Sequence, residues 1–433
     1  MAVQKCSFCG RPKNEVRSFV GGSGSGDDSA GPLICDRCIE TAYQAVQSGA
    51  KAPKAAAVKP KDPLRKPKEI KAFLDEYIIS QDRAKIDIAV AIYDHYKRRD
   101  AVAKKLQEVE VEKANILLLG PTGTGKTAIA RTIAKMLNVP FYNGDATRLT
   151  QAGYVGDDVE SLLQGLVQDA GGDIERAEWG IIYLDEVDKI ARSTGRERAG
   201  YRDVSGEGVQ QALLKLLEGS RVAVPRQGGK GLSGMTTMDT IDTKNILFIC
   251  AGSFAGIEEN VRQRIGGRTS LGFGAPERKK FSDLELYTLV TEQDILDFGI
   301  IPEMKGRLPV LTSTYELSEE DMVKVLVEPK NSIIKQVQFL FSLDNVDLQF
   351  EPEALLAIAR EAKKQPMGAR ALRSIVEKVT AKLKYELPSD PTIETVIVTE
   401  RAVTGEGEPM IKRRVQESTS SPVAGEESDK NRA

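Results

Sequence analysis

The stretch Gly120-Pro121-Thr122-Gly123-Thr124-Gly125-Lys126-Thr127 constrains the fold more than any other part of this chain. It matches the phosphate-binding loop G-x-x-x-x-G-K-[ST] at every required position. The apolar run at 115–119 before it indicates a buried parallel strand, and residues 128–137 after it carry apolar side chains at helical spacing. In this setting, backbone N–H groups and the helix dipole favour nucleotide phosphates. The sequence therefore predicts an α/β nucleotide-binding domain.

The residues predicted to bind the nucleotide lie in this loop and just after it. Lys126 adds positive charge at the β- and γ-phosphates, and the hydroxyl of Thr127 is suited to Mg²⁺. A chance glycine turn would not require the Lys-Thr pair. The residues expected to bind the nucleotide here are Pro121, Thr122, Gly123, Thr124, Gly125, Lys126, Thr127 and Ala128.

A second apolar run, at 180–184, ends in Asp185 and Glu186. Asp185 is placed to join the Mg²⁺ coordination shell, and Glu186 is placed to polarise an attacking water. Two acids after a strand can also form a solvated turn. Behind a phosphate-binding loop at this spacing they instead predict a nucleotide hydrolase, with Lys126, Asp185 and Glu186 as catalytic residues.

Four of the five cysteines form two pairs, Cys6-x-x-Cys9 and Cys35-x-x-Cys38, separated by 25 residues. The first residues lack the apolar core of a secretory signal, so we expect a cytoplasmic protein in which disulfides are disfavoured. Two such pairs predict one structural Zn²⁺ held by four thiolates, with a redox dithiol as the weaker alternative. A filled thiolate shell leaves no open position for catalysis by this metal.

Composition narrows the possible functions. With 61 basic and 63 acidic residues the net charge is −2, which argues against general nucleic-acid binding. No apolar run approaches the length of a membrane span, so no membrane partner is expected. At 433 residues and 41% hydrophobic content, the chain is long enough for several packed domains.

Pattern changes along the chain divide it into five parts. Residues 1–50 form the zinc-binding module, and the Lys-, Ala- and Pro-rich residues 51–68 form a flexible linker. Alternating strand and helix patterns in 69–315 predict the large α/β domain. Residues 316–404 predict a small, mainly helical lid whose helices begin at Ser318 and Pro352. The charged residues 405–433 predict a disordered tail.

These features in this order resemble the ClpX family, the AAA+ unfoldase subunits of the ClpXP protease. The resemblance spans about Cys6 to Thr399. It implies an AAA+ P-loop domain with a small helical lid behind a zinc module. It also implies a homohexamer that hydrolyses ATP to unfold tagged or unfolded proteins and pass them to a ClpP-type peptidase ring. The same family implies that adaptor proteins bind the zinc module and that the unfoldase can act as a chaperone without the peptidase.

Further motifs carry the resemblance to individual residues. Gly153-Tyr154-Val155-Gly156 resembles the family's pore loop, in which Tyr154 and Val155 would grip substrate. Leu271, Gly272 and Phe273 resemble the loop that docks on the peptidase. Arg307 resembles the arginine that reaches a neighbouring subunit's γ-phosphate, and Arg370 resembles the lid arginine at the nucleotide. Ile78 and Ile79 resemble the family's adenine contacts.

The chain departs from the family pattern in two places. The family commonly has Gly in its Ile-Gly-Gln box, where this chain has Ser80, and its basic pore-entrance motif is absent from 227–232. The chain shows no Ser-His-Asp set, so peptide-bond cleavage is assigned to the partner. The alternative function is a nucleic-acid motor or a clamp-loading ATPase whose zinc module binds DNA or RNA. A scaffold or adaptor without hydrolysis is the third possibility.

Overall fold

The computed structural model describes residues 5–12, 15–21, 33–47, 65–103, 109, 111–150, 157–192, 206–230, 236–266, 283–365 and 367–414. The chain divides into two compact units, residues 1–61 and 62–433. The second unit contains the large α/β domain and the lid.

The first unit is the cysteine module. Strands β1 (Phe19–Gly21) and β2 (Leu33–Cys35) pair antiparallel, and helix α1 (Asp36–Gln47) follows directly. This small module has few buried apolar residues among those described. A domain of this size usually needs a metal or disulfides for stability.

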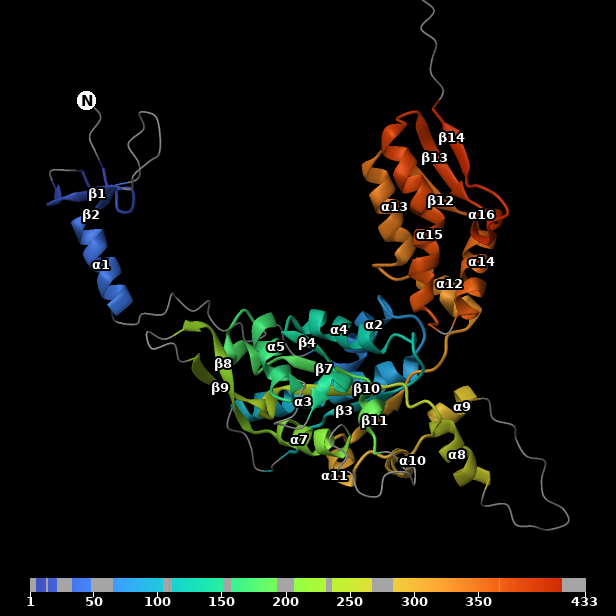
Figure 1. Cartoon of the computed structure of the whole chain (residues 1–433), viewed down its shortest axis with the longest axis horizontal. Coiled ribbons are helices and arrows are strands. Elements are labelled where there is room, and N and C mark those ends of the chain that lie inside the picture. The colour runs from blue at the N-terminus through green and yellow to red at the C-terminus, as the bar shows by residue number, and fades with distance from the viewer. Residues whose placement is uncertain are drawn as a thin grey trace, which may run out of the picture. The chain divides into compact units, whose positions relative to one another are not determined.

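The large domain is built on a five-stranded parallel sheet, ordered β11-β3-β10-β7-β4 (Figure 1). Its strands are β3 (Ile116–Leu119), β4 (Phe141–Asp145), β7 (Ile181–Asp185), β10 (Leu247–Gly252) and β11 (Val310–Ser313). The three central strands are largely apolar because both faces of the sheet are covered, as is usual in parallel sheets.

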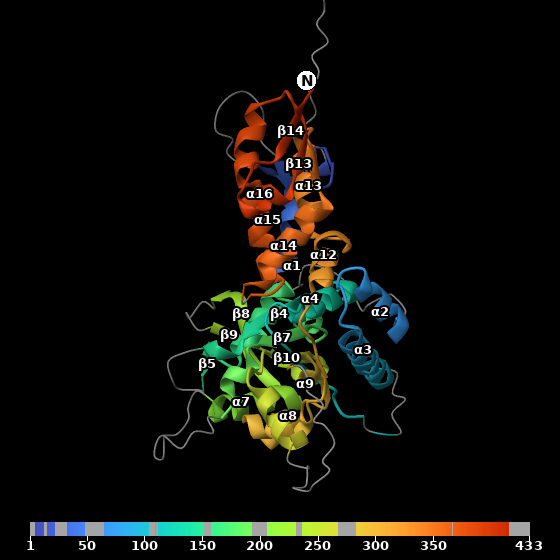
Figure 2. The ribbon, with the colours of Figure 1, turned by 90° about the vertical axis from the view of Figure 1, so that its right-hand side faces the viewer.

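Two hydrophobic cores lie on the two faces of this sheet. Alternation along β3 sends Ile116 and Leu118 into one core and Leu117 and Leu119 into the other. Figure 2 shows α2 and α3 on one side of the sheet and α7 and α8 on the other. Helices of the first face are α2 (Pro67–Asp75), α3 (Asp82–Ala103) and α4 (Lys126–Leu137). The second core is covered by α5 (Ser161–Asp169), α7 (Glu207–Glu218), α8 (Ile257–Gly266), α9 (Asp283–Thr288), α10 (Glu292–Phe298) and α11 (Pro302–Gly306).

Short elements join these parts. They include the hairpin β8 (Arg221–Lys230) with β9 (Thr236–Asp242), the pair β5 (Leu149–Thr150) with β6 (Asp157–Asp158), and α6 (Ile174–Ala177). The 3₁₀ turns η2 (Ala146–Arg148), η3 (Val187–Ile190) and η4 (Thr243–Asn245) each lie beside a strand end.

The lid has its own hydrophobic core. Its helices are α12 (Glu319–Val327), α13 (Ile333–Leu343), α14 (Pro352–Lys363), α15 (Arg370–Glu386) and α16 (Glu400–Thr404), with a 3₁₀ turn η5 (Leu387–Ser389). They pack around a three-stranded sheet of β12 (Asp347–Phe350), β13 (Ile393–Val398) and β14 (Met410–Arg413). Ser318 caps α12 by accepting from the N–H of Asp321, and Pro352 opens α14, as the sequence predicts.

Two expected boundaries need correction. The tail predicted to be disordered from residue 405 begins with structure, because Met410–Arg413 adds strand β14 antiparallel to β13. Main-chain pairing with an existing strand compensates for the polar composition that favoured disorder. At the other end, the linker expected to run to residue 68 ends earlier, since α2 begins at Pro67. Residues 415–433 lie outside the described part of the chain.

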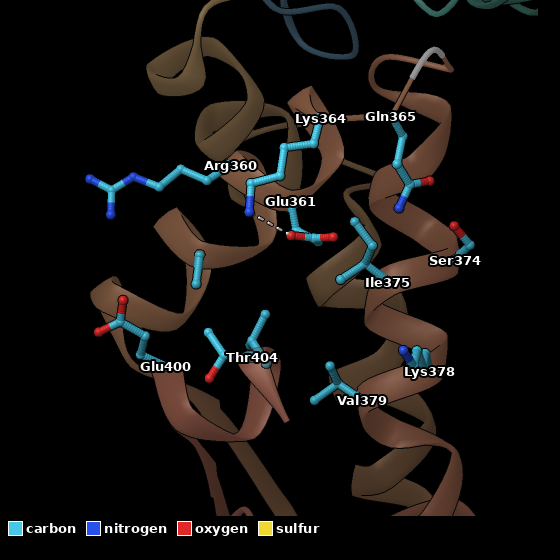
Figure 3. Close-up of a pocket in the computed structure, with 12 residues that line it drawn as sticks. Arg360, Glu361, Lys364, Gln365, Ser374, Ile375, Lys378, Val379, Glu400 and Thr404 are labelled. Atoms are coloured by element: carbon cyan, nitrogen blue, oxygen red, sulfur yellow. Dashed lines mark hydrogen bonds and ion pairs between the residues drawn. The ribbon is translucent and has the colours of Figure 1, made fainter. Parts of the chain in front are cut away.

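A cavity of about 490 Å³ lies within the lid, between α14, α15 and α16 (Figure 3). Its floor is apolar, with Ile375 and Val379, and Lys364 pairs with Glu361 at its rim at 3.1 Å. All of its lining residues belong to the lid, so this cavity is separate from the phosphate-binding loop.

Candidate nucleotide site

The phosphate-binding loop leaves the carboxyl end of β3 and enters α4 at Lys126. Gly120 and Gly123 have φ values of 140° and 82°, which side chains disfavour. A Cβ on Gly120 would lie 2.1 Å from Oγ1 of Thr314, and one on Gly123 would lie 2.3 Å from the carbonyl oxygen of Met367. The loop therefore requires glycine both for its conformation and for close packing against the residues after β11 and in the lid.

Lys126 is buried beneath this loop. Its Nζ donates to the carbonyl oxygens of Gly120 at 2.6 Å and Pro121 at 2.9 Å. Burial lowers the pKa of the ammonium to about 8, although the carboxylate of Asp185 acts in the opposite direction. A cation held in such a place is favoured by a bound anion.

Thr127 and Asp185 meet at the carboxyl edge of the sheet. Oγ1 of Thr127 donates to the Tyr183 hydroxyl at 3.2 Å and to Oδ2 of Asp185 at 3.4 Å. Because β3 and β7 are parallel neighbours of β10, their carboxyl ends lie at the same edge. A hydroxyl and a carboxylate are oxygen ligands of the kind that Mg²⁺ takes next to nucleotide phosphates. The structure therefore brings these two predicted residues together.

Glu186 adopts a left-handed backbone conformation, with φ of 58° and ψ of 32°. Such a conformation costs a residue other than glycine roughly 1–3 kcal/mol. Its N–H donates to Oδ1 of Asp185 at 3.0 Å, which helps to hold the turn. The turn redirects the chain from β7 into η3 and leaves the Glu186 side chain exposed at the sheet edge.

Sequence reasoning missed Asp188 and Ser253, which support this turn. The buried Asp188 carboxylate accepts from the backbone N–H of Ser253 at 3.1 Å and from its hydroxyl at 2.9 Å. These bonds join the turn that carries Glu186 to the end of β10. The available signal was the position of Ser253 immediately after an apolar strand, since parallel strands bring their carboxyl ends together.

The lid reaches the phosphate-binding loop. The Met367 carbonyl packs against Gly123, and Gly368 lies against the carbonyl of Thr122. Arg370 begins α15 just beyond this contact, and its charge adds to the lowering of the Lys126 pKa that burial causes. The predicted lid arginine is therefore close to the predicted phosphate site.

The segment with Ile78 and Ile79 lies between α2 and α3. Ile78 is buried and Ile79 is half-buried, and Ile78 packs in the core beneath α3. Gln81, the residue that begins the turn into α3, donates its side-chain amide to the Tyr315 carbonyl at 2.7 Å and accepts from the Tyr315 N–H at 2.9 Å. The segment predicted to contact adenine is thus bonded to the entrance of the lid.

Arg307 lies at the amino ends of the sheet strands, opposite the carboxyl ends that carry the phosphate-binding loop. Its carbonyl accepts from Nδ2 of Asn115, the residue before β3, at 2.9 Å, and its guanidinium pairs with Glu218 at 3.1 Å. The phosphate-binding loop follows the other end of β3, and a four-residue strand spans about 13 Å. The structure therefore does not bring Arg307 to the other site residues of its own chain.

The four paired cysteines converge in the first unit. Their Sγ atoms all lie within 4.8 Å of one another, with Cys6 and Cys38 at 4.0 Å and Cys9 and Cys35 at 3.7 Å. Tetrahedral zinc with Zn–S bonds of about 2.3 Å needs sulfurs about 3.8 Å apart. The four sulfurs therefore lie close to the spacing that zinc needs.

Backbone donors favour a thiolate in this cluster. Burial opposes ionisation of Cys6, but N–H groups of Cys9, Phe8 and Cys35 together lower the pKa of its thiol to about 6. The pKa of Cys38 is raised to about 12, chiefly by hydrogen bonds to the sulfurs of Cys9 and Cys35. Four thiolates repel one another unless a cation neutralises them, and zinc supplies that charge.

Two predicted sites fall outside the described residues. These are the pore pair Tyr154 and Val155 and the docking loop Leu271, Gly272 and Phe273. Within the part of the chain that is described, no helix combines the length and apolar character needed to cross a membrane.

Comparison with known proteins agrees with this arrangement in each segment. Residues 4–48 match the ClpX C4-type zinc finger, residues 111–311 match the AAA domain of the Cdc48 subfamily, and residues 317–395 match the C-terminal D2-small domain of ClpB protein. The ATP-dependent Clp protease ATP-binding subunit ClpX of Treponema denticola is similar along almost its whole length. It is 46% identical over 415 residues, which cover 94% of this chain and 96% of that protein.

Proposed function

Because the chain belongs to the ClpX family, we propose that this AAA+ ATPase unfolds protein substrates and drives them through a hexameric pore into a ClpP-type peptidase. One observation supports the motor function most strongly. Lys126, Thr127, Asp185 and Glu186 gather at one edge of the large domain, and the lid contacts the same loop. The lid therefore touches the loop that is proposed to bind the nucleotide phosphates.

The residues at the carboxyl ends of these strands have separate roles in hydrolysis. Backbone N–H groups of residues 122–128 and the ammonium of Lys126 hold the phosphates. Thr127 and Asp185 would hold Mg²⁺, and the ion would supply positive charge beside the nucleotide phosphates. Glu186 orients water for attack, and its strained turn is held by the hydrogen bonds of Asp185 and Asp188.

The contact between the lid and the phosphate-binding loop couples ATP hydrolysis to movement of the lid. Arg370 acts from the start of α15, and the carbonyl of Met367 lies against Gly123. A change in phosphate occupancy alters the charge facing Arg370, so the preferred lid position differs between nucleotide states. A conformational change of this kind requires such a difference in contacts between states.

Arg307 supports assembly of several copies. The phosphate-binding loop of its own chain lies at the other end of the sheet strands, so we assign Arg307 to the nucleotide of a neighbouring copy, where it would exchange its ion pair with Glu218 for the phosphates. An arginine supplied from outside a site stabilises transition-state charge and makes hydrolysis depend on assembly. We infer a homohexamer from family membership, with Arg307 completing the adjacent site.

The remaining assignments follow the family. Tyr154 and Val155 pull tagged or unfolded polypeptides through the pore, and Leu271, Gly272 and Phe273 dock on the peptidase ring. Adaptor proteins bind the zinc module, and unfolding without the peptidase provides a chaperone activity. We place the protein in the cytoplasm, where ATP is available and cysteines stay reduced for zinc. A nucleic-acid function is not supported by the net charge of −2.

The hydrolytic assignment is tested with Glu186→Gln. The variant should bind Mg·ATP as the unaltered protein does, while its hydrolysis rate falls at least about 100-fold, in line with loss of a general base. Binding is measured with a fluorescent nucleotide and hydrolysis by phosphate release. Glu259→Gln, exposed on the first turn of α8, is the matched control and should hydrolyse normally. An unchanged rate in Glu186→Gln would remove Glu186 from this role.

A further inference from the structure

Two consecutive residues between α2 and α3 adopt left-handed backbone conformations. Ser80 has a φ of 55° and Gln81 a φ of 62°. Glycine adopts this region freely, whereas other residues are disfavoured in it. Serine at this position therefore needs a compensating interaction.

That interaction is a hydrogen bond to the lid. Oγ of Ser80 donates to Oδ1 of Asp321 at 2.6 Å in a partly buried setting. Asp321 is the third residue of α12, and its other oxygen faces the backbone N–H of Ser318 in the helix cap. A hydrogen bond to a carboxylate is stronger than one between neutral groups. Ser80 thus ties the segment after α2 directly to the first turn of the lid.

The other end of this segment is fixed to the large domain. Nζ of the buried Lys85 donates to the Ile78 carbonyl at 2.7 Å and pairs with Asp75 at 2.7 Å. Gln81 is bonded in both directions to the backbone of Tyr315, ahead of α12. The segment therefore connects two bodies, with Ile78 held on the large domain and Ser80 held on the lid.

We propose that Ser80 is a positioning residue for nucleotide binding, acting through Asp321. The proposal rests on the function proposed above, in which Ile78 and Ile79 contact the adenine. When the lid moves, the bond moves Ser80 and changes the backbone path at Ile79, while Ile78 stays fixed on the large domain. Adenine affinity is in this way linked to lid position, through a bond that a glycine at residue 80 cannot make.

The central test replaces Ser80 with glycine in the full chain. Ser80→Gly removes the bond and also relieves the backbone conformation. We expect the Kd for a fluorescent ADP analogue to rise about fivefold, the effect of losing one hydrogen bond. The melting temperature should stay the same or rise, because glycine favours a positive φ. A bond with only a structural role would lower the melting temperature and leave the Kd unchanged.

A double-mutant cycle assigns the effect to Asp321. Asp321→Ala should weaken ADP binding to a similar degree, and Ser80→Gly in that background should weaken it no further. Ser342→Ala is the matched control in the lid, since its hydroxyl bonds to the Phe339 carbonyl within α13. It should bind ADP like the unaltered protein.

These experiments distinguish a wrong nucleotide function from a wrong role for Ser80. If the unaltered protein does not bind ADP, the proposed nucleotide function is wrong. If it binds ADP and Ser80→Gly binds equally well, only the role of Ser80 is wrong. Additive losses in the Ser80→Gly and Asp321→Ala double variant would also overturn the proposal, because the two residues would then act independently.

Discussion

The ammonium of Lys126 is buried, and burial disfavours its charged form. Burial lowers the pKa of its ammonium to about 8, and the nearby Arg370 adds to this effect. Because the usual value is about 10.4, the unfolded chain binds the proton more tightly than the folded one between these values. The contribution of Lys126 to the free energy of unfolding is therefore unfavourable below pH 8 and improves as the pH rises toward 10. Nucleotide phosphates offset this cost by supplying negative charge.

The charge of Lys126 makes ATP binding dependent on pH. We expect the Kd for Mg·ATP to rise above pH 8, approaching tenfold per pH unit, because phosphate binding requires the protonated ammonium. Titrations at pH 7, 8 and 9 measure this. Lys135→Gln, in the last turn of α4 and away from the loop, is the matched control and should keep the same dependence. A flat Kd from pH 7 to 9 would contradict the link between burial and phosphate binding.

At the scale of elements, local signals predicted what local interactions control. Ser318 and Asp321 form the expected helix cap, Pro352 opens α14, and the phosphate-binding loop has its strand and helix. Strand β14 was missed because its residues are all exposed and its pairing with β13 depends on distant sequence.

Helix α13 was missed in a segment that carries exposed apolar residues, such as Phe339 and Leu343, which weaken its amphipathic pattern. In the site, sequence identified the residue types of the loop and the acidic pair. The contact of Met367 with Gly123, the left-handed turn at Glu186 and the bond from Asp188 to Ser253 arise only when distant segments pack.

The zinc module should depend on its metal and the ATPase should not. Replacing the buried Cys35 with serine should reduce bound zinc from one ion per chain to none, because serine does not supply a thiolate ligand. Amide signals of the described residues 5–12, 15–21 and 33–47 should then lose their dispersion while ATP hydrolysis continues, since residues 62–433 form a separate compact unit.

Cys250→Ala provides the control for this experiment. Cys250 is a buried cysteine in β10 outside the cluster, so its loss should leave the zinc content unchanged. Zinc is counted by atomic absorption. Full zinc content in the Cys35→Ser variant would contradict the four-cysteine site.

At the scale of the whole molecule, the two ends of the sheet have different partners. The carboxyl edge carries the phosphate-binding loop and contacts the lid, while the amino edge carries Arg307, paired with Glu218. In the proposed function, the arginine that completes the nucleotide site is Arg307 of another copy, because Arg307 lies far from the phosphate-binding loop of its own chain. In the homohexamer that we propose, the same contact repeats from copy to copy, closes a ring and brings Arg307 of each copy to the nucleotide site of the next.

A shared site predicts complementation between two inactive variants. Arg307→Ala retains Glu186, and Glu186→Gln retains Arg307, so each alone should hydrolyse ATP at least about 100-fold more slowly. Mixed rings contain some sites with Glu186 from one copy and Arg307 from the next. Phosphate release should therefore recover on mixing, to a fraction set by random assembly. No recovery, with mixed rings shown to form, would place both residues in one chain's site.

The most direct test of the account follows the fluorescence of a folded reporter that carries a C-terminal degradation tag. The reporter is mixed with this protein, Mg·ATP and a ClpP-type peptidase. We expect the fluorescence to fall only when ATP is present, and not to fall with the Glu186→Gln variant. The loss should become irreversible only when the peptidase is present. Persistent fluorescence of a reporter shown to bind the protein, while ATP is hydrolysed, would contradict the claim that this ATPase unfolds proteins.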